Sequence, residues 1–325
     1  MRVCVTGGTG FLGTALVRDL LARGVPVRVL ARPSRRADLL ETQGAEVVHG
    51  GLGDPDCIAR AVQGADVAYH LAAKVDTPGS KADFLEANVA GTEQVLTGCL
   101  RQGVGRLVYA SSLAVYGPVA NGQRIDESTP YDESPQLRDF YAQSKILADQ
   151  LTVTFARERA LPITILRPGI IYGPGRQLPV ALLGFTLGKT NFVFGNRNHR
   201  IPLNYVENLV DAMQVAGHSG GGRFQQFNVL DDDELTLAKY HEAKTAVDKT
   251  VTHFSSGWPV RLVGPFAEIA IRMLPVGGSV RFSKHQLNRA LQDRWYDTHR
   301  ILEETGWAPK VPLHDALYRT WKAGR

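Results

Sequence analysis

A glycine-rich segment close to the N-terminus constrains the possible folds more than any other feature of this sequence. Residues 6–13 read Thr-Gly-Gly-Thr-Gly-Phe-Leu-Gly and separate an apolar run at 3–6 from a stretch with leucine and alanine at helical spacing that stops at Gly24. Glycines let a backbone turn tightly and approach a phosphate closely, and the start of the next helix offers free N–H groups and a partial positive charge. A strand, such a turn and a helix in this order predict a dinucleotide pyrophosphate site. We expect its contacts to come from Gly7, Thr9, Gly10, Phe11 and Leu12.

Strand-like and helix-like segments alternate through the first half of the chain. After the first strand, apolar β-type runs occur at 25–31, 46–49, 66–71, 107–110 and 163–166. Long helical patterns cover 83–102 and 140–159. Strict alternation implies a parallel sheet with helices on both faces, and right-handed crossovers make it a doubly wound sheet. The predicted fold class is therefore α/β, with a Rossmann-type doubly wound parallel sheet.

The alternating rhythm ends near residue 172, after which glycine, proline and polar turns interrupt shorter elements. We predict a dinucleotide-binding domain over 1–172 and a smaller, irregular substrate-binding region over 173–325, which can return one strand or helix to the sheet. An apolar stretch at 258–274 has Arg261, Glu268 and Arg272 on one helical face. It is read as an amphipathic helix over the C-terminal part, with an apolar lid or a membrane-surface contact as alternatives.

Composition argues against several classes of protein. The 325 residues carry 37 basic and 32 acidic side chains, and because the excess is scattered we expect no nucleic-acid partner. No window has the ~18–20 uncharged apolar residues of a membrane span, and Met1-Arg2 leads straight into a strand, so no targeting segment is expected. The three cysteines form no CxxC pair, which fits a reducing compartment, here the cytoplasm. The histidines lack metal-ligand spacing, so no metal site is predicted.

The residues after the second strand predict which nicotinamide cofactor binds. Sites that prefer NAD usually carry an acidic residue there for the ribose 2′-hydroxyl, but residues 31–36 read Ala-Arg-Pro-Ser-Arg-Arg. Guanidinium groups pair strongly with phosphate oxygens, so Arg32 and Arg36, with the Ser34 hydroxyl nearby, suit a 2′-phosphate. We expect NADP(H), with NAD(H) less favoured; the alternative is a basic loop exposed to solvent.

A tyrosine and a lysine four residues apart point to acid–base chemistry. Tyr141 and Lys145 fall on one face of the predicted helix at 140–159. A free phenol titrates too high to act as a base at neutral pH, and a nearby ammonium lowers its pKa. Ser112 follows the fifth strand directly, at the carboxyl edge where open α/β sheets bind ligands. The three residues are the candidate catalytic groups.

These segments, in this order, resemble the extended short-chain dehydrogenase/reductases, a group often called the NAD-dependent epimerase/dehydratase family. The glycine turn, the run from Tyr109 to Gly117 and Tyr141-x-x-x-Lys145 carry the resemblance. Other similar segments are His70-Leu71-Ala72-Ala73, Asn88-Val89-x-Gly91-Thr92, the run 166–175 and Gly306-Trp307-x-Pro309-Lys310-Val311-x-Leu313. The likeness extends over nearly the whole chain.

The resemblance implies roles for the catalytic candidates. Tyr141 would be the general acid/base, Lys145 would lower its pKa and hold the nicotinamide ribose, and Ser112 would hydrogen-bond the reacting oxygen. Asn88 would support the local backbone, and Ser111 is not expected to take part in the chemistry.

The resemblance also implies which residues line the cofactor. Family members often contact adenine with an acidic residue after the third strand, but glycines occupy positions 50–51 here. Adenine is then expected to be held by the backbone or by Leu52. The other cofactor contacts expected from the resemblance are Leu71, Ala72, Ala73, Tyr141, Lys145, Pro168 and Ile171.

Two departures from the sugar-nucleotide members bear on the substrate. Ile170 stands where those members typically have an asparagine that contacts the diphosphate, and residues 203–208 resemble the 3β-hydroxysteroid dehydrogenase branch. The predicted function is an NADP(H)-dependent oxidoreductase of a 3β-hydroxysteroid-dehydrogenase-like or dihydroflavonol-reductase-like branch. It would be a homodimer that interconverts a ketone or aldehyde and an alcohol on a steroid-like, flavonoid-like or acyl molecule.

Two other functions stay open at this stage. One is a nucleotide-sugar epimerase or dehydratase with tightly bound NAD(P), for which Arg197 and Arg200 are the candidate diphosphate ligands. The other is a non-catalytic dinucleotide sensor, but such relatives usually lack the pair formed here by Tyr141 and Lys145.

Overall fold

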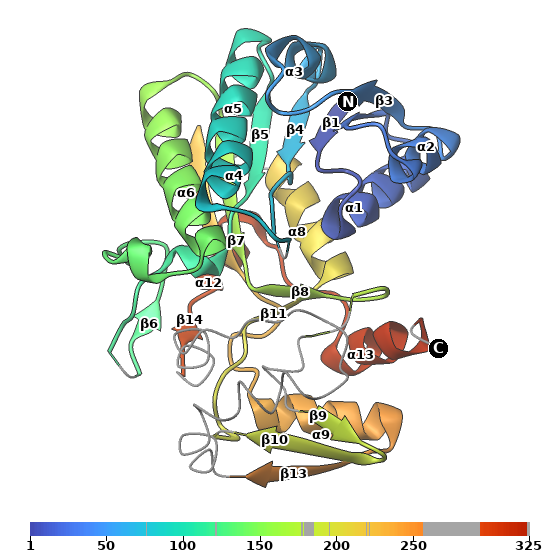
Figure 1. Ribbon diagram of the computed structural model, residues 1–325, viewed down its shortest axis with the longest axis vertical. Coiled ribbons are helices and arrows are strands. Elements are labelled where there is room, and N and C mark those ends of the chain that lie inside the picture. Colours follow the sequence, from blue (N-terminus) through green and yellow to red (C-terminus); the bar gives the residue numbers. More distant parts are fainter. Residues whose placement is uncertain are drawn as a thin grey trace.

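A parallel sheet of seven strands forms the centre of the protein (Figure 1). The computed structural model describes residues 1–75, 77–120, 122–176, 178, 185–194, 196–218, 220, 222–255 and 293–323. From one edge to the other the strands are β3 (Glu46–His49), β2 (Val27–Ala31), β1 (Val3–Thr6), β4 (Val67–His70), β5 (Arg106–Ala110), β7 (Ile163–Pro168) and β12 (Phe224–Val229). This order places the reversal of the winding between β1 and β4, so the predicted doubly wound sheet is confirmed.

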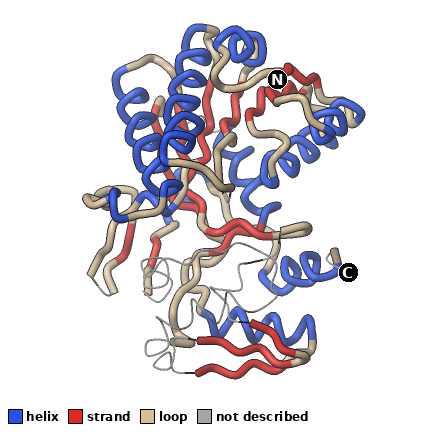
Figure 2. Tube along the Cα trace, viewed as in Figure 1, coloured by secondary structure: helices blue, strands red, loops and turns tan. Residues whose placement is uncertain are grey.

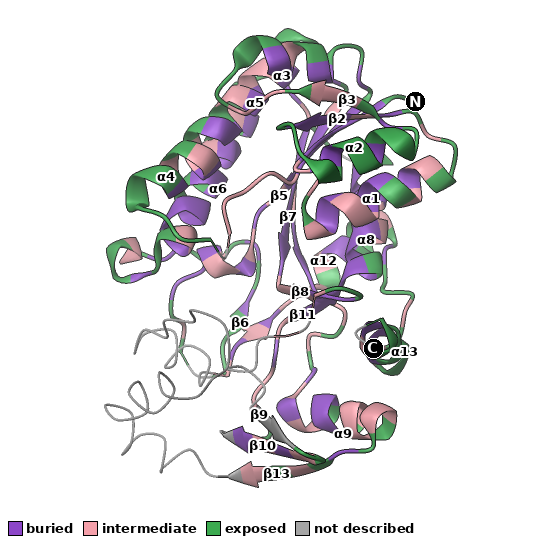
Figure 3. Cartoon of the chain, turned by 45° about the vertical axis from the view of Figure 1, so that its right-hand side comes forward, coloured by how far each residue is buried: buried purple, intermediate pink, exposed green. Residues whose placement is uncertain are grey.

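Helices cover both faces of this sheet, as Figure 1 shows. On one face lie α3 (Pro55–Val62), α5 (Gly91–Arg101) and α6 (Phe140–Glu158), and on the other α1 (Phe11–Ala22), α2 (Arg35–Thr42) and α8 (Val206–His218). Strands buried on two faces need side chains that are apolar along their whole length, not only at alternate positions. The inner strands β1, β4 and β7 are buried at every residue, and the centre of the sheet, around β5 and β7, is coloured as buried in Figure 3.

The long helix expected at 83–102 is divided into three pieces. It consists of α4 (Lys81–Leu85), a π-helical turn at Glu86–Ala90 and α5. Single π turns inside α-helices are often found at functional sites. Here the turn carries Asn88, whose side chain donates to the carbonyl of Lys74 and to the Ser144 hydroxyl and accepts from the Lys74 N–H. The π turn therefore fixes the chain after β4 beside α6.

The second half of the chain contributes to the sheet as well as to a separate lower layer (Figure 2). Strand β12 pairs with β7 along its whole length, and α8 packs against α1. The lower layer has β9 (Phe185–Leu187), β10 (Thr190–Phe194) and β13 (Val251–Ser255) with α9 (Leu237–Asp248) packed on β13. Smaller pieces are β6 (Arg124–Ile125) with β14 (Trp295–Tyr296), β8 (Ile170–Tyr172) with β11 (Leu203–Tyr205), α12 (His299–Thr305) and α13 (Leu313–Lys322). Strand β12 and helix α8 therefore belong to the same layers as the elements of the first half of the chain.

One apolar core joins these layers. It begins with Val5 and Val17, between the sheet and α1, and continues to Tyr240 and Leu317 in α9 and α13. The division near residue 172 remains a prediction, and the helix expected at 262–274 lies outside the described residues. Within the described ranges no helix is both long and apolar enough to cross a membrane.

Candidate active site

The glycine turn between β1 and α1 has room for backbone only. Gly7 has a φ of +76°, and a Cβ at this position would lie 2.5 Å from the backbone nitrogen of Ala72. A Cβ at Gly13 would lie 2.1 Å from the Gly7 carbonyl oxygen. The Gly10 N–H closes the turn by donating to that same carbonyl over 2.9 Å. Both glycines are therefore required by close approach of neighbouring backbone.

The start of α1 is electrically suited to a pyrophosphate. No side chain caps this helix, and no acidic residue stands in its first turn. The starts of α2, α3 and α6 differ, because Ser34, Asp54 and Asp139 accept hydrogen bonds from their first-turn N–H groups. Uncapped N–H groups and the positive end of the helix dipole favour an anion at this point. The turn thus fits the phosphates of a dinucleotide.

The segments expected to line the cofactor gather at the carboxyl edge of the sheet. The chain leaving β4 passes directly over the turn, where the Leu71 N–H donates to the Thr6 carbonyl over 3.1 Å. Leu52 lies close to the start of α5, since its Cδ1 would be 2.8 Å from a Cβ at Gly91. The remaining members are half-buried, apart from Pro168, which is buried at the end of β7. They are Leu71, Ala72, Ala73 and, in β8, Ile171.

Of the two arginines proposed for the 2′-phosphate, Arg36 contacts this turn. Arg32 follows β2 and is exposed. Arg36, in the first turn of α2, reaches back to the glycine turn and donates to the Thr9 carbonyl over a long 3.4 Å. The Ser34 hydroxyl, grouped with the arginines in the sequence, accepts from the Ala37 N–H and caps α2. The Arg36 guanidinium is thus close to the phosphate turn, while the serine oxygen already has a structural partner.

The three catalytic candidates come from two neighbouring elements. Tyr141 is half-buried in the first turn of α6, and Lys145 is buried one turn further on. Ser112 follows β5 and its hydroxyl accepts from the Ala114 N–H over 3.1 Å, starting a short 3₁₀ turn that packs on α6. The Lys145 ammonium donates to the Ala110 carbonyl at the end of β5, over 2.7 Å. The lysine therefore connects the tyrosine helix to the strand that precedes Ser112.

The environment of Lys145 favours its neutral form more than water does. Burial lowers the pKa of the ammonium to about 8, with a smaller opposing effect from the Asp149 carboxylate. A lysine that titrates near neutral pH is suited to proton transfer and to tuning a neighbouring phenol. The pKa of Lys145 therefore lies closer to neutral pH than that of a lysine in water, and its role at the site remains a prediction.

A buried polar cluster behind Lys145 was not foreseen from the sequence. His70, at the end of β4, lies between the hydroxyls of Thr6 and Thr92, at 2.6 and 2.9 Å. The Tyr109 phenol, buried in β5, stacks on the His70 ring and accepts from the Lys145 ammonium over 3.2 Å. The only signal in the sequence was polar residues at the ends of otherwise apolar strands.

A buried ion pair holds the other side of the β5–α6 junction. Arg167 in β7 donates to the Asp149 carboxylate in α6 over 2.7 and 3.1 Å, and both side chains are almost wholly inaccessible to solvent. Ser111 and Tyr131 also donate to Asp149. The Ser111 hydroxyl therefore serves the structure rather than facing a ligand, in line with its expected lack of a chemical role.

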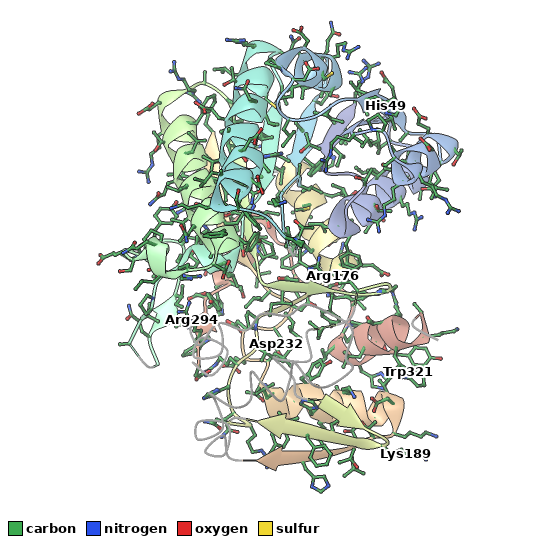
Figure 4. The ribbon with its side chains drawn as sticks, in the orientation of Figure 1. His49, Arg176, Lys189, Asp232, Arg294 and Trp321 are labelled. Carbon is green, nitrogen blue, oxygen red and sulfur yellow. The ribbon has the colours of Figure 1, made fainter. Side chains whose placement is uncertain are left out.

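Arg176 is a site residue that the sequence analysis did not single out. Its guanidinium lies 5.8 Å from the centre of the Phe11 ring, in the first turn of α1. The turn that carries it bridges Gly173 and Arg176, at the level where the sheet meets the lower layer (Figure 4). An arginine beside an uncapped helix start adds positive charge to the phosphate region.

The two candidate diphosphate ligands of the alternative function have other contacts. Arg200 donates to the Asp293 carboxylate over 2.8 Å and lies 4.7 Å from the Trp295 ring. Arg197 lies 5.5 Å from the centre of the Phe254 ring. In the part of the chain that the structure describes, no cluster of three or more His, Cys, Asp or Glu side chains could hold a metal ion.

Comparison with known proteins adds an independent view. The model of the NAD dependent epimerase/dehydratase family matches residues 3–229. A 2-alkyl-3-oxoalkanoate reductase of Stenotrophomonas maltophilia is 29% identical over 98% of each chain. A 3β-hydroxysteroid dehydrogenase/Δ5→4-isomerase of Mycobacterium tuberculosis is 34% identical over 97% of this chain and 88% of its own. The crystal structure of gox2253 covers 99% of this chain and 97% of its own, with a TM-score of 0.77 and 25% identity.

Proposed function

Because this chain belongs to the NAD-dependent epimerase/dehydratase family, we propose that it is an NADP(H)-dependent oxidoreductase that interconverts a ketone or aldehyde and an alcohol on an apolar small molecule. The observation that carries the proposal is the buried Lys145 ammonium, anchored to the end of β5 one helical turn from Tyr141. Ser112 stands two residues beyond that anchor. A phenol, a cation and a hydroxyl at the carboxyl edge of the sheet form a proton-transfer site.

In this mechanism the side chains handle the proton and the orientation of the substrate. A bound nicotinamide, with its ribose held by Tyr141 and Lys145, would supply hydride-transfer chemistry at the reacting carbon. Tyr141 gives its phenolic proton to the carbonyl oxygen during reduction, and the Lys145 ammonium stabilises the phenolate that results. The Ser112 hydroxyl donates a hydrogen bond to the same oxygen and orients it. In the oxidative direction the phenolate takes the alcohol proton.

The cofactor would be NADP(H), held by the segments at the carboxyl edge. The uncapped start of α1 with Gly7, Thr9, Gly10, Phe11 and Leu12 would take the pyrophosphate, because it presents N–H groups without a competing side chain. Arg32 and Arg36 would bind the 2′-phosphate, and Leu52 would lie against adenine. The other lining residues proposed are Leu71, Ala72, Ala73, Pro168 and Ile171, with Tyr141 and Lys145 at the nicotinamide ribose.

Two features support an apolar substrate. Ile170 offers hydrocarbon where a sugar-nucleotide enzyme typically offers an amide, and a doubly charged diphosphate needs fixed polar partners. The relatives described above, one named a reductase of 2-alkyl-3-oxoalkanoates and one a steroid dehydrogenase, act by their names on carbonyl or hydroxyl groups of largely apolar molecules. Steroid-like, flavonoid-like and acyl ketones are the proposed class.

A nucleotide-sugar epimerase or dehydratase is the second candidate. It is favoured by the family itself, whose name covers both activities. It is weakened by the two arginines that would clamp the diphosphate, because Arg200 is paired with Asp293 and stacked on Trp295, and Arg197 lies against Phe254.

The experiment that separates the two candidates follows the NADPH absorbance band. The enzyme and NADPH are mixed with a panel of 3-oxo-acyl, steroid and flavonoid ketones, and in parallel with UDP- and dTDP-sugars. We expect stoichiometric loss of NADPH with an apolar ketone and none with the sugars. An epimerase would regenerate its cofactor within each cycle, so epimer formation without NADPH consumption would replace the first candidate by the second.

We also propose that the enzyme is a cytoplasmic homodimer. The apolar side chains of Leu137, Phe140 and Leu147, before and in the first half of α6, are 65%, 42% and 41% exposed. Leu137 ends the 3₁₀ turn that packs on α6, and exposed apolar groups on neighbouring elements favour burial against a second copy. The cysteines Cys4, Cys57 and Cys99 are buried free thiols, as expected in a reducing compartment. Sedimentation of the wild type and of Leu147→Glu tests the dimer.

A further inference from the structure

We propose that Tyr109 is a positioning residue that holds the Lys145 ammonium in the orientation and charge state needed at the site. This proposal rests on the proposed function in one respect, namely that Lys145 holds the cofactor and lowers the pKa of Tyr141. Tyr109 itself is buried within β5, with about 1% of its surface exposed. It acts through the lysine.

The contacts between the two side chains are close and of two kinds. The Lys145 Nζ lies 3.2 Å from the Tyr109 Oη and 4.7 Å from the centre of the phenol ring. An ammonium is attracted both to a hydroxyl oxygen and to the face of an aromatic ring, and burial strengthens both interactions. Tyr109 therefore stabilises the charged form of Lys145 in a place where desolvation opposes it.

The contact with Tyr109 also restricts the orientation of the Lys145 ammonium. An ammonium has three N–H groups. The Tyr109 oxygen accepts from one of them and the Ala110 carbonyl accepts from a second. The two acceptors thus belong to consecutive residues at the end of β5. One N–H then remains for the cofactor or for Tyr141. Without the phenol oxygen, the ammonium would keep a single anchor and could rotate.

A rigid support stands behind the phenol. The Thr92 hydroxyl donates its proton to the Asn88 carbonyl, so His70 must donate to Thr92 through Nε2. His70 then accepts at Nδ1 from the Thr6 hydroxyl. Every polar atom of the imidazole is satisfied in its neutral form, and its ring stacks on Tyr109 at 5.5 Å between centres. The phenol therefore has little freedom to move away from the lysine.

The charged and titratable groups that face Lys145 come from three elements. Tyr141 and Asp149 lie on its own helix, Tyr109 on β5 and His70 on β4. Asp149 is already bound to Arg167, and burial together with the Lys145 charge lowers the pKa of His70 to about 3, so that His70 is neutral in the working range. Among the described residues, Tyr109 is thus the neutral side chain that accepts a hydrogen bond from the ammonium.

The test measures NADPH binding against pH, by the fluorescence of the bound cofactor, for the wild type and Tyr109→Phe. We expect wild-type affinity to fall as Lys145 loses its proton above about pH 8. The variant should begin to fall about 1–2 pH units lower, because a hydrogen bond to the charged form is lost. Tyr69→Phe, in the adjacent strand β4, is the matched control, since it removes a buried phenol oxygen that has no hydrogen-bond partner among the described residues. Its profile should match the wild type.

Each outcome decides the proposal. An unchanged midpoint in a folded Tyr109→Phe protein overturns it, as does a wild-type profile without a fall between pH 7 and 10. Should Tyr109→Phe fail to fold, 3-fluorotyrosine incorporated at position 109 keeps the shape but makes the oxygen a poorer acceptor. A smaller shift in the same direction is then expected, and no shift refutes the idea. Because binding needs no substrate, failure of the ketone panel leaves this readout intact.

Discussion

Cofactor selection by Arg32 and Arg36 can be tested quantitatively. Arg32 is exposed beyond the end of β2, and a 3.4 Å hydrogen bond to the Thr9 carbonyl connects Arg36 to the glycine turn. A bond this long is weak, so the guanidinium can turn to a phosphate at little cost. The perturbations are Arg36→Gln, which removes one charge, and Arg32→Asp, which reverses one.

The expected size of the effect follows from the chemistry of the contact. A charge-assisted hydrogen bond contributes about 1.5–3 kcal/mol, which corresponds to about 10- to 150-fold in affinity. Both arginines lie near the surface, so salt should screen their attraction and reduce the effect. Arg36→Gln should weaken NADPH binding by about 10-fold at low salt and leave NADH binding nearly unchanged. Arg32→Asp should reverse the preference, because a carboxylate repels the 2′-phosphate and accepts from a 2′-hydroxyl.

The assay is a calorimetric titration of wild type and variants with NADPH and with NADH, at low and at high salt. Arg101→Gln, an exposed arginine at the end of α5, controls for the loss of net charge. Equal affinity of the wild type for the two cofactors would refute the reasoning. So would a preference for NADPH that survives in both variants.

Three further outcomes are expected. Tyr141→Phe should lower kcat by about 10²–10⁴-fold and leave NADPH binding intact, as measured by stopped-flow turnover and titration. Asp149→Asn should lower the free energy of unfolding, measured with urea, by about 3–5 kcal/mol, because Arg167 stays buried without its partner. The control Asp19→Asn, from an exposed pair with Arg23, should lower it by less than about 1 kcal/mol. Burial lowers the pKa of His70 to about 3, so wild-type stability should fall from about pH 6.5 downwards, by up to about 1.4 kcal/mol per pH unit from this group. In His70→Asn the free energy of unfolding, measured with urea at each pH, should depend less on pH.

Local patterns were sufficient to predict the central part of the fold. The strands at 3–6 and 46–49 have the predicted limits, and Phe140–Glu158 differs from the predicted helix by one residue. These elements are specified by neighbours in sequence: apolar runs, caps and glycine stops. The family was likewise readable from motifs, and the comparisons confirm it, including the likeness to 3β-hydroxysteroid dehydrogenases.

What could not be predicted depends on contacts between distant segments. The strand β8 has three residues between a glycine and a glycine-proline pair, and only its pairing with β11 makes it a strand. The π turn before α5 interrupts a helical pattern that is continuous in sequence. The contact of Tyr109 with Lys145 joins residues 36 positions apart, so the sequence places both near the site but does not show that they touch.

Strand β12 comes from the second half of the chain, and this limits where the protein can be truncated or joined to a relative. Its six residues pair with β7, so a chain ending at residue 172 would retain the predicted cofactor contacts but expose β7 as a new edge. Exposed edges attract other strands and promote aggregation. Such a fragment would also leave α1 without the helix α8 packed beside it. A functional chimera that takes its substrate specificity from a relative must therefore exchange the loops around β12 and α8 while keeping those two elements matched to their own sheet.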